Sequence, residues 1–149
     1  MSSYFEPAGP RAGVNGLMMT RFVAQGTLVA TNAVAGTYVD FGGIFTTNIT
    51  TIAGDQVHIV VQSNGKKDVG GAGTVVVDRG GIKLPASGVN SSVYLDASTA
   101  PTYVPFTLEY WDAPGAGTFT YKPQLFTSDA NTAHAGNGGQ CQYIVEIWR

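Results

Sequence analysis

Apolar and polar residues alternate with a period of two along the clearest segments of this chain, as they do in β-strands. Residues two apart share one face of a sheet, so each such segment has a core face and a half-polar face. In the segment 103–111, the core face is predicted to carry Val104, Phe106, Leu108 and Tyr110. The opposite face then carries Tyr103, Thr107, Glu109 and Trp111.

Two further segments alternate in the same way. The segment 140–148 directs Cys141, Tyr143, Val145 and Ile147 to the core, and Gln142, Ile144, Glu146 and Trp148 to the other face. The segment 55–62 directs Val57, Ile59 and Val61 inward, and Gln56, His58, Val60 and Gln62 outward. Shorter apolar or β-branched runs predict strands over 17–31, 37–41, 44–51, 74–78, 89–96 and 117–125.

Turn residues separate these segments. Asn64-Gly65 predicts a tight hairpin turn, because both residues tolerate positive φ. Segment 112–117 (Asp-Ala-Pro-Gly-Ala-Gly) predicts a chain reversal for the same physical reason. Segments 66–73 and 127–139 lack a hydrophobic period, and we expect loops there.

The order of strands and turns predicts an all-β fold. About eight to ten short strands, turn signals at short intervals and no helical period indicate an antiparallel jelly-roll sandwich or barrel. The 149 residues suit one domain. Residues 1–16 contain two prolines and three glycines without any period, so we expect an extended N-terminal arm followed by a single β domain over 17–149.

Charge is scarce in this chain. Charged residues make up 12% of the sequence, against roughly 25% in ordinary soluble domains. The net charge of −2 supplies no field that would attract nucleic acid or an anionic membrane surface. The sequence shows no signal peptide and no apolar run long enough to span a membrane. A surface of this kind suits a protein packed against neighbours; the alternative is a monomer whose sheet is coated with Thr, Ser and Asn.

Residues that carry catalytic or metal chemistry are not clustered in the sequence. His58 and His134 are far apart, and Cys141 is the single cysteine. Neither a nucleophile elbow nor a metal-ligand spacing occurs, so we expect no enzyme activity, no metal and no cofactor. One alternative stays open, a calcium site built from loop aspartates among Asp78, Asp96, Asp112 and Asp129.

The predicted arm carries adjacent aromatic residues, which are uncommon in a disordered tail. It could contact a neighbouring molecule, or it could fold over its own barrel. Under the first interpretation its contact residues are Tyr4, Phe5, Pro7, Pro10 and Arg11.

The last third of the chain resembles the tumour necrosis factor-like jelly rolls of bacteriophage virion proteins. The segments that carry the resemblance are Tyr103–Trp111, Asp112–Gly117, Gly117–Leu125 and Gln140–Trp148. The resemblance implies a homotrimer on the virion, made in the host cytoplasm. Two half-apolar sets then become candidates for the trimer interface: Thr107, Glu109 and Trp111, and Ile144, Glu146 and Trp148.

This resemblance implies one of two roles. The arm favours a capsid decoration (cement) protein that binds the major capsid protein and stabilises the shell. The alternative is the receptor-binding, lectin-like tip of a fibre, which a shallow groove lined by aromatics such as Tyr94 or Trp111 would favour. A fibre tip usually follows a long shaft, and none is present in this sequence. A jelly-roll enzyme is a third and weaker hypothesis.

Overall fold

The computed structural model describes residues 16–27, 30–84, 93–95, 102–136 and 139–149, with the side chains of 93 and 94 excepted. These ranges contain twelve strands: β1 (Met18–Thr27), β2 (Ala30–Asn32), β3 (Thr37–Asp40), β4 (Thr47–Thr51), β5 (Gln56–Lys67), β6 (Gly73–Arg79), β7 (Ile82–Leu84), β8 (Val93–Leu95), β9 (Val104–Asp112), β10 (Gly117–Thr127), β11 (Ala133–Ala135) and β12 (Gln140–Trp148). One 3-10 turn, η1 (Gly43–Phe45), precedes β4. The count exceeds the predicted eight to ten because four of the strands are only three residues long.

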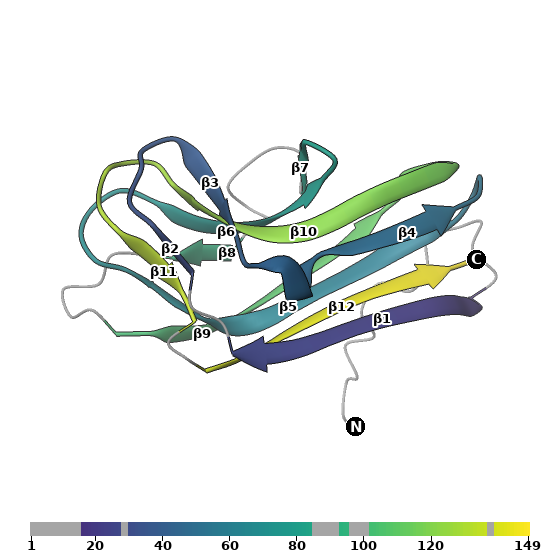
Figure 1. Cartoon of the computed structure of the whole chain (residues 1–149), viewed down its shortest axis with the longest axis horizontal. Coiled ribbons are helices and arrows are strands. Elements are labelled where there is room, and N and C mark those ends of the chain that lie inside the picture. Colours follow the sequence, from purple (N-terminus) through teal and green to yellow (C-terminus); the bar gives the residue numbers. More distant parts are fainter. Residues whose placement is uncertain (1–15, 28–29, 85–92, 96–101, 137–138) are drawn as a thin grey trace, which may run out of the picture.

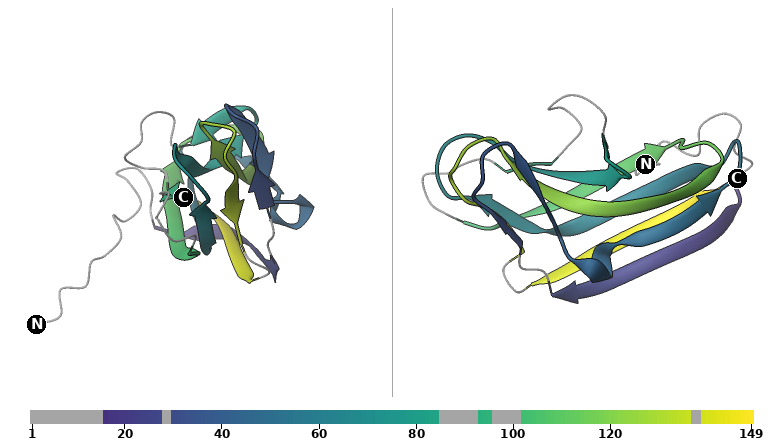
Figure 2. Two further views of the ribbon diagram at one scale, coloured as in Figure 1. Left: turned by 90° about the vertical axis from the view of Figure 1, so that its left-hand side faces the viewer. Right: turned by 45° about the horizontal axis from the view of Figure 1, so that its top comes forward.

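The strands form two antiparallel sheets packed face to face, which confirms the predicted all-β jelly-roll sandwich (Figure 1). The first sheet has the order β1-β12-β5-β11-β2, and β9 also pairs with β5. The second sheet has the order β3-β10-β6-β7, with β4 on β10 and β8 on β6. The strand β12 runs alongside β1 in Figure 1 and in the right-hand view of Figure 2.

The core lies between the two sheets, where the alternating pattern placed it. Val57, Ile59 and Val61 of β5 are fully buried, as are Val75 and Val77 of β6. Burial of each such side chain stabilises the fold by about 1.5–3 kcal/mol. One expected core residue is placed differently: Val104 is 58% exposed, because it begins β9 beyond the edge of the core.

The predicted hairpin turn at Asn64-Gly65 is wrong. Strand β5 continues through both residues to Lys67, and Gly65 pairs with Val104 on one side and Ala135 on the other. A Cβ atom at Gly65 would lie 2.9 Å from the backbone oxygen of His134. The glycine is therefore needed for close strand packing, and the chain reverses later, between β5 and β6.

The segment 127–139, expected to be a loop, contains the end of β10 and the short strand β11. Lys67, which belongs to the other expected loop at 66–73, holds this segment in place. The Lys67 ammonium is completely buried and donates hydrogen bonds to Asp129 Oδ1 at 2.6 Å and to the backbone oxygen of Asn131 at 2.6 Å. This ion pair fixes the polar segment against the end of the sandwich.

Candidate functional site

The outward-facing side chains of β1, β12, β5 and β9 form one continuous surface, called here the outer face. Both residue sets predicted for a trimer interface lie on it. Thr107, Glu109 and Trp111 come from β9, and Ile144, Glu146 and Trp148 come from β12. Strand β5 lies between β9 and β12 and pairs with both. The two predicted patches are thus parts of the same surface.

The strand register orders the outer face into rows that differ in chemistry. One row is charged and aromatic: Arg21, Glu146, His58 and Trp111. The next is largely aliphatic: Val23, Ile144, Val60 and Glu109. The third is uncharged and polar: Gln25, Gln142, Gln62 and Thr107.

His58 is the centre of the first row, flanked by two carboxylates. Its Nε2 lies 2.7 Å from Glu109 Oε1, and its Nδ1 lies 3.0 Å from Glu146 Oε2. An ionised carboxylate only accepts hydrogen bonds, so both contacts are hydrogen bonds only when both ring nitrogens carry a proton. The sequence placed His58 on the outward face, but it did not reveal either carboxylate partner.

Both tryptophans of the chain join this group. The His58 and Trp111 rings stack with 4.4 Å between centroids, and the centroids of Trp111 and Trp148 are 6.1 Å apart. The Trp148 indole N–H donates to Glu146 Oε2 at 3.2 Å. We call these five residues (His58, Glu109, Trp111, Glu146 and Trp148) the aromatic–acidic cluster. Rigid aromatic rings with satisfied polar edges are typical of the centre of a binding interface.

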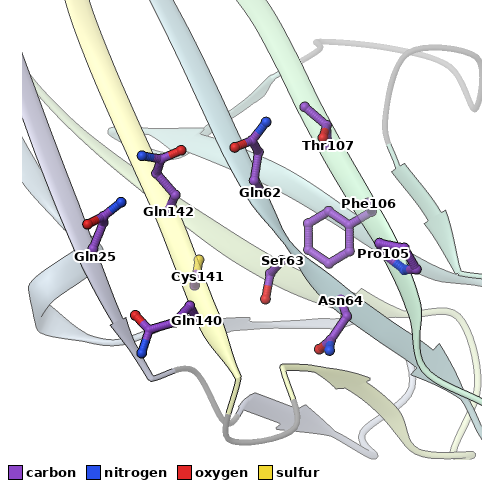
Figure 3. Close-up of a pocket in the computed structure, with 10 residues that line it drawn as sticks. All are labelled: Gln25, Gln62, Ser63, Asn64, Pro105, Phe106, Thr107, Gln140, Cys141 and Gln142. Atoms are coloured by element: carbon purple, nitrogen blue, oxygen red, sulfur yellow. The ribbon is translucent and has the colours of Figure 1, made fainter.

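The third row opens into a groove of about 520 Å³ on the outer face. Five side-chain carboxamides from three strands line it: Gln25, Gln62, Asn64, Gln140 and Gln142. Ser63, Pro105, Phe106, Thr107 and Cys141 complete the lining, which contains no charged residue (Figure 3). We call this the amide groove. The sequence hinted at it only through the outward positions of Gln62 and Gln142.

Cys141 supplies no reactive thiolate to this groove. Its side chain is buried, and burial raises the pKa of the thiol to about 11. The thiol is therefore protonated near neutral pH and behaves as a small apolar group.

Three of the four loop aspartates considered for a calcium site each pair with a cation. Asp78 binds Lys83 at 2.5 Å, Asp112 binds Arg79 at 2.6 Å, and Asp129 binds Lys67 at 2.6 Å. Asp96 lies outside the described residues. No group of three or more His, Cys, Asp or Glu residues in the described ranges is arranged to hold a metal ion.

The predicted contact residues of the arm, Tyr4, Phe5, Pro7, Pro10 and Arg11, all lie outside the described residues. For the part of the chain with assigned structure, no helix is long and apolar enough to cross a membrane.

Comparison with known proteins leaves the family open. No protein-family model matches this chain, and no curated protein matches it. Among solved structures, the crystal structure of dimeric latent PorU from Porphyromonas gingivalis is similar at 9% sequence identity with a TM-score of 0.45. The match covers 94% of this chain and 14% of the PorU chain.

Proposed function

We propose that this chain is a homotrimeric virion protein that binds the outside of an assembled bacteriophage capsid and stabilises it without catalysis. The observation that carries the proposal is the outer face. It gathers both tryptophans, Ile144, Val60 and Val23 on one sheet, and Val23 is 45% exposed. A half-apolar sheet face of this kind suits burial against other subunits.

The aromatic–acidic cluster gives this surface a fixed shape. Its rings and carboxylates already hold one another, so little side-chain freedom remains to be lost on association. Packing one copy of the cluster against a neighbour would stabilise a trimer by a few kcal/mol per buried tryptophan, on the order of 1.5–3 each.

A trimer suits the role of a decoration protein for an energetic reason. A ligand that binds only the assembled shell stabilises the shell by mass action. Three arms on one trimer would engage neighbouring capsid sites, and the second and third contacts become intramolecular. The proposed partner is the major capsid protein, and the resemblance of the last third of the sequence to phage virion jelly rolls supports this choice.

The test is to add the purified protein to undecorated capsids of its own phage. We expect the decorated capsids to survive higher temperature and lower ionic strength than bare capsids, measured by the release of packaged DNA. A variant that carries Ile144→Lys on the outer face is the control, because a protein that does not trimerise loses the avidity. Capsids of unchanged stability would overturn the proposal.

A second candidate, the receptor-binding tip of a fibre, is favoured by the amide groove. A groove was expected for this role, but its aromatic lining residue among the described residues is Phe106 rather than the expected Trp111. Trp111 lies outside the groove and stacks on His58, and the side chain of Tyr94 lies outside the described residues. Protein that leaves capsids unchanged and adheres to host cells would favour this role.

A further inference from the structure

We propose that the amide groove binds a neutral carbohydrate, through hydrogen bonds from the carboxamides of Gln25, Gln62, Asn64, Gln140 and Gln142 to sugar hydroxyls. The proposal concerns a different part of the outer face from the aromatic–acidic cluster. It does not depend on capsid binding.

The groove has unused hydrogen-bonding capacity. Each carboxamide offers two N–H donors and an oxygen with two lone pairs. None of these five side chains hydrogen-bonds to another protein group among the residues with assigned positions, although all five line one hollow (Figure 3). By contrast, Gln124, a glutamine on the second sheet, both donates to Asp40 and accepts from Lys83.

A buried hydrogen-bond acceptor lies at the groove. Asn64 Oδ1 is shielded from solvent and has no hydrogen-bond partner among the described residues. A buried polar atom without a partner costs about as much free energy as a lost hydrogen bond, so a rotation of Asn64 that brings this oxygen to a donor in the groove would be favourable. A sugar hydroxyl supplies such a donor and accepts from a neighbouring carboxamide at the same time.

The absence of charge from the lining selects a neutral ligand. A carboxylate, phosphate or ammonium group would lose hydration in the groove without gaining an ion partner. The charged residues two positions from the groove on the same face are already paired: Glu109 with His58, and Lys66 with Asp68. An apolar ligand is disfavoured as well, because it would cover the carboxamides and leave their donors and acceptors unpaired.

The sheet itself argues for a polyhydroxylated ligand over an extended peptide. An added peptide strand needs free backbone groups at a sheet edge, but β5 and β12 are interior strands that pair on both sides. Only side chains are available, spread across strands about 4.8 Å apart and along them at about twice 3.3 Å. Hydroxyls distributed around a sugar ring match such a two-dimensional array. The volume of about 520 Å³ lies in the range of about 300–1,000 Å³ common for small-ligand sites.

The experiment is a screen of the full chain on an array of neutral oligosaccharides, with sialylated and sulfated oligosaccharides on the same array. Titration calorimetry with the best-binding oligosaccharide follows. We expect a neutral oligosaccharide to bind, and we expect Gln62→Ala and Gln142→Ala each to weaken binding at least tenfold. Gln56→Ala is the matched control, because Gln56 lies on the same strand outside the groove and should leave affinity unchanged.

Several results would overturn the proposal. One is that no neutral oligosaccharide binds, and another is that the sulfated oligosaccharides bind more tightly than the neutral ones. A third is that neither Gln62→Ala nor Gln142→Ala changes the affinity. A change of oligomeric state in Gln62→Ala, without loss of sugar binding, would assign the groove to contact between copies instead. Thermal unfolding of each variant checks that the fold is retained.

Discussion

The imidazole of His58 lies against the indole of Trp111, with 4.4 Å between the ring centroids and 19° between the ring planes. This contact makes the protein's own fluorescence a probe of the outer face. Trp111 and Trp148 are the two tryptophans of the chain, and both belong to the aromatic–acidic cluster.

We expect the substitution His58→Gln to change the tryptophan emission of the folded protein, because it removes the ring that stacks on Trp111. His134→Gln should leave the emission unchanged, because His134 contacts Tyr103 and Asp68 instead. Identical emission from His58→Gln and the unmodified chain would contradict this contact.

The proposed trimer predicts that one charge on the outer face dissociates the protein. Ile144→Lys would place an unpaired ammonium in the middle of the subunit contact, which costs several kcal/mol in a desolvated interface. We expect folded monomers by light scattering, against trimers for the unmodified chain at micromolar concentration. The matched control is Ile82→Lys on β7 of the other sheet, where Ile82 is 49% exposed, and it should remain trimeric. A monomeric unmodified chain would end the trimer proposal.

Two fully buried tyrosines predict opposite responses to the same substitution. The Tyr121 hydroxyl donates to Asp112 Oδ2 at 2.6 Å, and Arg79 holds both oxygens of that carboxylate. Tyr121→Phe should therefore lower the free energy of unfolding by about 1.5–3 kcal/mol. The hydroxyl of Tyr143 has no partner among the described residues, so Tyr143→Phe should be neutral or stabilising by up to about 1 kcal/mol. Denaturant unfolding measures both. Equal losses in the two variants would show that Tyr143 has a bonding partner after all.

The ion pair between Asp55 and Arg149 predicts a loss of stability in acid. Arg149 donates to both oxygens of the buried Asp55 carboxylate at 2.8 and 3.0 Å, and these hydrogen bonds hold the pKa of Asp55 below its usual value. A carboxyl whose pKa is lowered in the folded state stabilises the protein above its unfolded pKa, about 3.9. That contribution is lost as the pH falls through the lower folded pKa.

Accordingly, Asp55→Asn should lower the free energy of unfolding by about 1–3 kcal/mol at neutral pH, since Arg149 is partly exposed and screened. The difference from the unmodified chain should shrink as the pH falls below the unfolded pKa of about 3.9. The control is Asp40→Asn, whose exposed pair with Lys122 should contribute only about 0.2–1 kcal/mol. A constant difference at all pH values would show that the effect of Asp55→Asn is not electrostatic.

Deleting residues 1–16 tests the arm. We expect the shortened chain to fold and to form the same trimer, because all twelve described strands begin after this segment. Its affinity for capsids should fall, since Tyr4 and Phe5 would each contribute about 1.5–3 kcal/mol if buried on a neighbour. A sedimentation assay with undecorated capsids measures the difference. Equal binding would show that the arm does not hold the capsid.

The sequence predicted which face of a sheet a residue occupies better than it predicted which residues contact one another. Period-two alternation correctly placed Val57, Tyr143 and Ile147 in the core, because burial on one side of a sheet requires it. The same pattern cannot tell which strands pair, so it could not bring His58 between Glu109 and Glu146. That arrangement depends on strand register.

Predictions from short sequence patterns were wrong where packing against distant residues determined the structure. Asn64-Gly65 has the sequence of a hairpin turn, but pairing with β9 and β11 keeps it extended. Lys67 lies in segment 66–73, where the lack of a hydrophobic period predicts a loop, and lysines are almost never fully buried. In the structure its charge is compensated by Asp129, a partner distant in sequence.

The position of β12 in the first sheet has a consequence for biosynthesis. It lies between β1 and β5, yet it is the last strand in sequence order. A growing chain therefore holds β1 without its neighbour until nearly every other strand has been translated. The apolar residues of β1 remain accessible to chaperones or to other nascent chains throughout that time. A ribosome that stops before Gln140 would release a polypeptide whose first sheet lacks the strand between β1 and β5, and such a polypeptide would be readily proteolysed.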